Sequence, residues 1–242
     1  MTEPPPHPPV TPNCKVGVIY LCAAAALTAI AMPLSVTRSR WWLLLLWPAT
    51  TLAILSFAYF GFGPAAGVFR KRAGKLPLTT KLMMWPIILG QRASLLRYRA
   101  RSKAWDEITD RLWLGRVLND REAADAIAQG VSAVLDVTVE LPENRVFREL
   151  PHYLNIPILD LTAPTPQQKR EAIAFLDEQL AAGRTVYVHC KAGYSRSGAI
   201  VGSYLIHAGI VASRDEAIEH LRRRRGRIIL RPEAAASIGA DG

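Results

Sequence analysis

Cysteine is scarce in this chain of 242 residues, which has three, at positions 14, 22 and 190. They form no Cys-x-x-Cys pair, and an odd number disfavours a framework of disulfides, so the spacing argues against both a disulfide scaffold and a cysteine-ligated metal. Cys14 and Cys22 lie at or inside a hydrophobic segment, where a thiol is usually inert. If Cys190 is a functional thiol, a reducing compartment suits it best.

Charge is missing from two long stretches near the N-terminus. Residues 16–36 and 41–60 contain no acidic or basic side chain. Each matches the roughly 20 residues that a helix needs to cross the hydrocarbon core of a bilayer. The mean hydropathy of +0.12 and the charged fraction of 21% also indicate that part of the chain lies in lipid. We therefore expect a transmembrane helical hairpin within residues 16–62.

The flanks of these stretches agree with a membrane hairpin. Trp41 and Trp42 precede most of the second stretch and Tyr59 lies near its end, as in the aromatic belts of membrane proteins. Pro48 is tolerated within a span. Residues 1–15 are rich in proline and are expected to form a disordered tail. A cleaved signal peptide is the alternative for the first stretch, although a second apolar stretch follows immediately.

Acidic residues are absent from residues 61–103, which carry ten Lys or Arg. The short loop between the two apolar stretches has two arginines, so the positive-inside rule places both termini in the cytoplasm. We expect residues 63–104 to be a basic juxtamembrane segment, in which Leu82–Leu89 lies against anionic headgroups. The alternative is a solvated linker with a buried apolar patch.

The net charge of +10 and the pI near 9.9 indicate an anionic partner. A run of basic residues, Arg222–Arg225 followed by Arg227, lies at a predicted helix end but lacks the interleaved aromatics of single-strand binders. We therefore expect anionic membrane lipids, and no nucleic acid, as partners.

From residue 105 onward, strand and helix patterns alternate as in an α/β domain with a mainly parallel central sheet flanked by helices. Thr165 followed by Pro166 is a helix start, and Gly183 lies beyond the end of that helix. The domain is expected to cover residues 105–233, with a tail at 234–242. Residues 108–115 are predicted to form a strand or a hairpin, and the other predicted strands are 131–135, 153–159 and 185–189. The predicted helices are 120–129, 165–182, 197–208 and 213–225.

The sequence Val-Tyr-Val-His-Cys-Lys-Ala-Gly-Tyr-Ser-Arg-Ser-Gly at residues 186–198 combines a buried strand, a tight loop and a helix start. The loop amides and the positive helix end converge on a point, which makes a socket for a tetrahedral dianion such as phosphate. The same field lowers the pKa of a thiol at Cys190. The predicted phosphate loop consists of Lys191, Ala192, Gly193, Tyr194, Ser195 and Arg196.

This arrangement predicts nucleophilic attack by Cys190 on phosphorus, giving a phosphocysteine that water hydrolyses. Arg196 can grip two phosphate oxygens with its planar fork. Ser197 can donate a hydrogen bond to the thiolate and help it leave, and His189 is expected to order the loop. The alternative is an inert core cysteine at a strand end.

A leaving alkoxide needs a proton, so a carboxylic acid should lie above the socket. Asp160 follows a predicted strand and begins a loop, which places it at the carboxyl edge of the sheet. A surface aspartate or a helix cap is the structural alternative for Asp160. Asp136, also at a strand end, is the competing general acid.

The segment His-Cys-Lys-Ala-Gly-Tyr-Ser-Arg-Ser-Gly resembles the HCxxGxxRS signature of the cysteine-dependent dual-specificity phosphatases, in the protein tyrosine phosphatase superfamily. The resemblance extends from Trp105 to Glu233, and the 30 residues between Asp160 and Cys190 fit that family. The chain looks most like the branch containing the mitochondrial phosphatidylglycerophosphate phosphatase and bacterial membrane-anchored relatives. A departure is Tyr194, where lipid-directed relatives often carry a second basic residue.

The resemblance implies four catalytic roles and one supporting role, and it implies no metal or cofactor. Cys190 is then the nucleophile, Arg196 the phosphate clamp, Asp160 the general acid and Ser197 the leaving-group helper. Arg231 would brace the loop. The branch also carries an acidic cluster upstream, for which Asp136 and Glu140 are weak counterparts here.

Three functions fit these features. The first is a cytoplasmic-facing phosphatase, anchored by two spans, for a phospholipid monoester such as phosphatidylglycerophosphate. The second is a phosphatase for phosphotyrosine, phosphoserine or phosphothreonine on membrane-proximal proteins. The third is a catalytically inactive phosphate-binding anchor, which the joint presence of Cys190, Arg196 and Asp160 disfavours.

Overall fold

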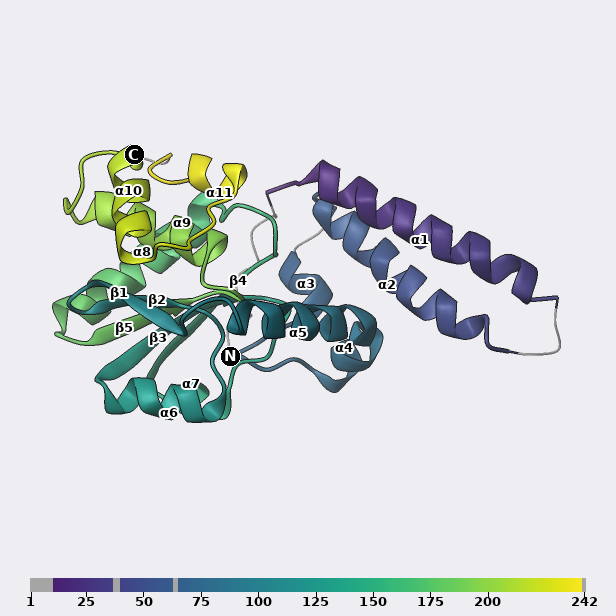
Figure 1. Ribbon diagram of the computed structural model, residues 1–242, viewed down its shortest axis with the longest axis horizontal. Helices are drawn as coiled ribbons and strands as arrows, with labels where there is room; N and C mark the ends of the chain where they lie inside the picture. Colours follow the sequence, from purple (N-terminus) through teal and green to yellow (C-terminus); the bar gives the residue numbers. More distant parts are fainter. Residues whose placement is uncertain (1–10, 37–39, 63–64, 241–242) are drawn as a thin grey trace, which may run out of the picture.

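The structure is a computed structural model that describes residues 11–36, 40–62 and 65–240. Figure 1 shows a domain in three layers, with helices on both faces of a sheet, and two long helices that project from one side of it. Shorter helices lie between the projecting pair and the sheet. The expected α/β class, with helices flanking a central sheet, is confirmed.

The sheet has five strands in the order β1-β2-β5-β3-β4. β1 is antiparallel to β2, and the other neighbours are parallel, so the sheet is mainly parallel as predicted. β5 therefore lies in the middle, and its carboxyl end opens at the edge where ligands bind in parallel sheets. The strands are β1 (Trp105–Thr109), β2 (Leu112–Gly115), β3 (Val131–Thr138), β4 (His152–Ile158) and β5 (Thr185–His189).

Alternation along β5 shows how the two faces are covered. Val186 and Val188 belong to the core beneath α8 (Pro166–Ala181) and α9 (Ser195–His207), whereas Tyr187 packs with Phe147 on the opposite face. Successive side chains of a strand point to opposite faces, so a run of apolar residues marks a strand buried on both sides. Figure 1 shows α6 (Asp120–Ala128) and α7 (Arg145–Arg148) on one face and α8 (Pro166–Ala181), α9 (Ser195–His207), α10 (Arg214–Arg224) and α11 (Pro232–Ala236) on the other.

Local capping explains where two of these helices begin. Thr165 accepts a hydrogen bond from the main-chain N–H of Gln168, whose side chain bonds back to Thr165, and Pro166 takes the first helical position. Ser213 accepts from the N–H of Glu216 in the same way at α10. These contacts satisfy N–H groups that have no partner within the helix.

The two projecting helices are α1 (Cys14–Leu34) and α2 (Leu43–Tyr59). They lie side by side in Figure 1, and the hydroxyl of Ser56 in α2 donates to the carbonyl oxygen of Gly17 in α1 at 2.8 Å. Among the described residues, α1 alone is long and apolar enough to cross a membrane; α2 is apolar but has 17 residues. The prediction of two spans is therefore not confirmed.

The described part of the basic segment, residues 65–104, packs on the domain, since Phe69, Met84 and Ile88 share an apolar cluster with residues of the domain. It forms α3 (Ala65–Phe69), α4 (Leu78–Met83) and α5 (Trp85–Arg99), so the predicted interfacial stretch 82–89 is divided between two helices. One of its cations is not available to headgroups, because Lys71 is buried and its ammonium lies 2.6 Å from the carboxylate of Asp136. The prediction that the basic residues of this segment face the membrane surface is therefore wrong for Lys71. Composition does not distinguish a buried lysine from an exposed one.

The predicted boundaries change at both ends. α1 begins at Cys14, capped by Asn13, so residues 11–15 are part of the folded structure, while residues 1–10 lie outside the described residues. The tail predicted at 234–242 is wrong for its first half: Ala234 and Ile238 are buried. The side chain of Ile238 packs on Gly202 of α9, where an added Cβ would meet it at 2.9 Å. The domain therefore continues at least to Ile238.

Candidate active site

The phosphate loop leaves the central strand and enters α9 within a few residues. Cys190 follows β5 directly, and Arg196 lies in the first turn of α9. Gly193 has φ of +69°, and a Cβ at this position would lie 2.3 Å from the carbonyl oxygen of Gly115. Only glycine permits both that conformation and that close approach. The tight loop predicted from the sequence is therefore present.

Cys190 has the surroundings of an activated thiol. Its Sγ accepts a hydrogen bond from the Ser197 hydroxyl at 3.2 Å, and its exposed fraction is 3%. Burial on its own raises the pKa of the Cys190 thiol, but the Arg196 charge and hydrogen bonds from Ser197 outweigh it, so the pKa is lowered. These groups favour the thiolate form of Cys190, which is the form that acts as a nucleophile, whereas an inert core cysteine needs no such partners.

Arg196 is buried and held in a fixed plane. Its Nη1 and Nη2 donate to the two carboxylate oxygens of Glu140 at 2.8 and 2.6 Å, and Nη1 also donates to the carbonyl oxygen of Ile158 at 2.9 Å. A bidentate pair of this kind fixes the orientation of the guanidinium as well as its position. Glu140 thus holds Arg196 in place, a contact that the sequence did not predict; the resemblance gave Glu140 only as a weak counterpart of an acidic cluster.

Asp160 lies in the same pocket as the nucleophile. Its carboxylate is 2.8 Å from Lys191 Nζ and 3.1 Å from Arg196 Nη2. Burial on its own raises the pKa of Asp160, but the charges of Arg196 and Lys191 outweigh it and lower the pKa to about 2. Without substrate the carboxylate is therefore ionised, and a bound phosphate dianion would raise its pKa by competing for the same cations.

The pocket has a volume of about 80 Å³ and includes a wall from outside the sheet domain. Tyr98 of α5 lines it, and its ring contacts that of Tyr194 edge-on with centroids 5.7 Å apart. Lys191 donates a hydrogen bond to Gln91, also on α5. Neither α5 residue was predicted, because nothing local to them differs from the rest of the basic segment. The lining residues are Tyr98, Asp160, Leu161, Cys190, Lys191, Ala192, Tyr194, Ser195, Arg196, Ile229 and Arg231.

The phosphate loop is held by Arg225, whereas the predicted brace Arg231 reaches the loop through its main chain. Arg225 is buried, and its Nε donates to the carbonyl oxygen of Gly193 at 3.0 Å while Nη1 donates to Asp106 at 2.6 Å. Arg231 is exposed and meets the loop through its main-chain N–H, which donates to Ser195 Oγ at 3.1 Å. The sequence does not indicate that Arg225 is buried and Arg231 exposed, because both arginines belong to the same basic C-terminal region.

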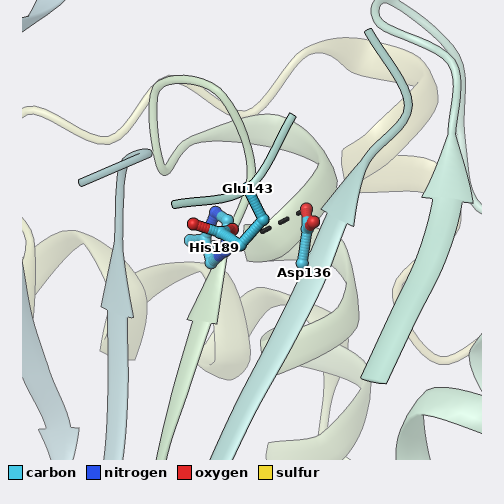
Figure 2. A group of neighbouring side chains, drawn as sticks. All are labelled: Asp136, Glu143 and His189. Atoms are coloured by element: carbon cyan, nitrogen blue, oxygen red, sulfur yellow. Dashed lines mark ion pairs between the residues drawn. The ribbon is translucent and has the colours of Figure 1, made fainter. Parts of the chain in front are cut away.

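His189 and Asp136 belong to a buried cluster beneath the loop, shown in Figure 2. His189 Nε2 lies 2.7 Å from Glu143 and 4.0 Å from Asp136. Burial on its own lowers the pKa of His189, but the charges of Glu143 and Asp136 outweigh it and raise the pKa. The Asp136 carboxylate is tied to Lys71 and receives a hydrogen bond from Tyr153, so it is not placed as the competing general acid.

The acidic side chains and His189 of this cluster have atoms within 4.8 Å of one another, a spacing that could suit a metal ion. The chemistry of the donors argues against that use. Lys71 already supplies a positive charge to Asp136. The charges of Glu143 and Asp136 raise the pKa of His189, which favours the protonated form that has no lone pair for a metal ion.

Comparison with known proteins agrees with this geometry. Residues 112–238 match the family model described as dual specificity phosphatase, catalytic domain. Dual specificity protein phosphatase 2 of Mus musculus is 37% identical over 121 residues, which cover 50% of this chain and 37% of the relative. Phosphatidylglycerophosphate phosphatase PTPMT2 of Arabidopsis thaliana is 30% identical over 160 residues, covering 63% of this chain and 68% of the relative.

Solved structures agree at the level of the domain. The active form of Tk-PTP superposes with a TM-score of 0.52 at 27% identity, covering 57% of this chain and 95% of that one. PTPMT1 in complex with PI(5)P gives 0.51 at 26% identity, covering 56% and 92%. The chain thus spans nearly all of these domains but 37% of the mouse phosphatase. It belongs to the dual-specificity phosphatase family of the protein tyrosine phosphatase superfamily, and its domain is that of a cysteine-dependent phosphoric monoester hydrolase.

Proposed function

We propose that the protein is a membrane-anchored phosphatase that hydrolyses a phospholipid monoester, with phosphatidylglycerophosphate as the leading substrate. The observation that carries the proposal is that α5 lines the pocket with Tyr98 and exposes apolar side chains toward its other end. Trp85 is 43% exposed and Leu89 54%. Large exposed apolar groups close together mark a surface that binds a partner or a membrane.

The position of α4 and α5 supports a lipid surface as that partner. The carbonyl oxygen of Met83, the last residue of α4, accepts hydrogen bonds from Trp47 at 3.2 Å and from Thr51 at 3.1 Å. Both donors belong to the apolar helix α2. The exposed apolar residues of α4, Leu78 and Leu82, therefore lie next to the proposed span. A substrate held in the headgroup layer would meet the pocket without leaving the bilayer.

The proposed reaction has two steps. The Cys190 thiolate attacks phosphorus, the bond to the lipid oxygen breaks, and Asp160 gives its proton to that oxygen as it leaves. Water then attacks the phosphocysteine and transfers a proton to the Asp160 carboxylate, and the S–P bond breaks with Ser197 donating to the departing thiolate. Arg196 and the loop amides stabilise the charge on the equatorial oxygens in both steps.

The anchor is proposed to be the hairpin of α1 and α2, with both termini and the catalytic domain in the cytoplasm. α2 is about 26 Å long at 1.5 Å per residue, and the residues before it, including Trp41 and Trp42, add to this length. The basic residues of 63–104 favour the cytoplasmic side. A reporter fused after Gly242 should behave as cytoplasmic, and an exported reporter would contradict this topology.

A protein substrate is the second candidate function. The identity of 37% with a protein phosphatase over the catalytic region favours it, and so does the aromatic Tyr194 in place of a second basic residue. In this case the apolar face of α4 and α5 would hold the domain near membrane-proximal phosphoproteins.

Phosphate release by the full chain in detergent distinguishes the candidates. The assay compares phosphatidylglycerophosphate micelles with phosphotyrosine and phosphoserine peptides, with Cys190→Ser as the blank. We expect kcat/KM for the lipid to be at least a hundredfold higher, which is about 2.7 kcal/mol of transition-state discrimination. Comparable or faster turnover of the peptides would overturn the lipid assignment. Activity of Cys190→Ser equal to that of the parent would overturn the mechanism.

A further inference from the structure

The chain turns sharply just after the general acid. Leu161 has φ of +62°, in the left-handed region that a branched side chain rarely adopts. Such a conformation persists where the surrounding structure holds it in place. The Asp160 carboxylate is held by Lys191 and Arg196. The main-chain carbonyl groups at this turn are held from another direction, by the hairpin.

Two hydrogen bonds join the turn to the base of the hairpin. The hydroxyl of Tyr59, the last residue of α2, donates to the carbonyl oxygen of Asp160 at 2.8 Å. The side-chain amide of Asn13, the N-cap of α1, donates to the carbonyl oxygen of Leu161 at 2.7 Å. Asn13 and Tyr59 are themselves joined, because the N–H of Asn13 donates to the carbonyl oxygen of Tyr59 at 2.9 Å. We call these two residues the acid-loop clamp.

Packing reinforces the acid-loop clamp. Tyr59 is 2% exposed, and its ring lies against Tyr20 of α1 with centroids 5.3 Å apart. Leu159 and Leu161, on either side of the general acid, pack in the same apolar cluster as Tyr59 and Leu55 of α2. The turn is therefore attached to the hairpin by side chains as well as by main-chain hydrogen bonds.

We propose that Asn13 and Tyr59 are positioning residues for the general acid, so that the membrane anchor takes part in proton transfer to the leaving group. The inference rests on the proposed role of Asp160. A general acid must lie within hydrogen-bond reach of the atom that it protonates, and a displacement of about 1 Å can cost as much as a hundredfold in rate. Loss of a clamp bond leaves a carbonyl group without its partner and frees the turn to move.

The test uses the full chain in detergent and two soluble esters, an alkyl phosphate with a poor leaving group and p-nitrophenyl phosphate with a good one. Tyr59→Phe removes the hydroxyl and keeps the ring. Ser56→Ala is the matched control. Ser56 lies one helical turn from Tyr59, and its buried hydroxyl also donates to a carbonyl oxygen, but that oxygen belongs to the hairpin and not to the acid loop. We expect Tyr59→Phe to lower kcat/KM about tenfold for the alkyl ester and less than twofold for the aryl ester. Ser56→Ala should change both less than twofold.

Asn13→Ser is the second variant, since serine keeps the capping oxygen but has no amide to reach Leu161. It should show the same dependence on the leaving group. In an Asp160→Asn background, Tyr59→Phe should cause no further loss, because the group that it positions has been removed.

The possible outcomes separate this inference from the assignment of Asp160. If Asp160→Asn slows the alkyl ester selectively but Tyr59→Phe slows both esters alike, the clamp is structural and the inference fails alone. The same holds if Ser56→Ala reproduces the effect of Tyr59→Phe. If Asp160→Asn slows both esters equally, the general-acid role fails and the inference fails with it.

Discussion

Lys71→Met removes a positive charge from the interior while keeping a side chain of similar length. The Lys71 ammonium lies 2.6 Å from the Asp136 carboxylate and donates to the hydroxyl and carbonyl oxygens of Thr138 at 2.7 and 3.0 Å. Both ionic side chains are fully buried. Without Lys71 the carboxylate keeps its desolvation penalty and loses a compensating charge, and breaking a buried pair in this way costs about 3–5 kcal/mol.

The loss should appear as a lower melting temperature of the full chain in detergent, followed by near-ultraviolet circular dichroism. With about 2–4 °C for each kcal/mol in a protein of this size, Lys71→Met should melt roughly 6–20 °C below the parent. Lys75→Met is the control, because Lys75 belongs to the same loop and is exposed. Surface substitutions of this kind usually change stability by less than about 0.5 kcal/mol.

The charge itself can be tested in two further ways. Adding Asp136→Asn to Lys71→Met should restore part of the stability, since it removes the uncompensated carboxylate. Burial raises the pKa of Asp136, but Lys71 and His189 outweigh it and lower the pKa. Stability from this group is therefore present above the ordinary pKa of an aspartate and lost as pH falls through the folded pKa. Equal melting temperatures of Lys71→Met and Lys75→Met would refute this reasoning.

Two further predictions concern the catalytic residues. Glu140→Gln should lower kcat/KM for p-nitrophenyl phosphate about tenfold to a hundredfold, because the Glu140 carboxylate accepts hydrogen bonds from both Nη atoms of Arg196. An unchanged rate would show that the loop alone orients the guanidinium. Ser197→Ala should move the pH midpoint of Cys190 alkylation by iodoacetamide upward, because the hydroxyl helps to lower the thiol pKa, and phosphoenzyme should accumulate in rapid-quench experiments. An unchanged midpoint would remove Ser197 from the stabilisation of the thiolate.

The phosphate loop could be predicted because its parts are adjacent in the chain. Cys190 and Arg196 are joined by one strand, one loop and one helix start, so local rules on glycine and helix ends fix their relation. The same holds for the start of α8, where Thr165 and Pro166 act on their immediate neighbours. Predictions of this kind depend on contacts over a few residues.

The contacts that Glu140 and Gln91 make with the loop could not be predicted from local patterns, since each residue acts on a distant part of the chain. Glu140 is separated from Arg196 by 56 residues and Gln91 from Lys191 by 100. A carboxylate after a strand has the same local pattern whether it faces solvent or a buried arginine. The burial of Lys71 could not be predicted either, because it depends on which distant segment packs over this side chain.

One wall of the pocket lies outside the residues that the family model matches. Gln91 and Tyr98 belong to α5, whereas the family match begins at residue 112. Tyr98 lines the pocket, and Gln91 holds Lys191 of the phosphate loop, so α5 contributes both to the shape of the pocket and to the support of the loop. A chimera that places residues 112–238 on another membrane anchor would lose this wall, together with Lys71 and the acid-loop clamp. The residues that frame the pocket and hold the turn after Asp160 thus come in part from segments that precede the family-model match.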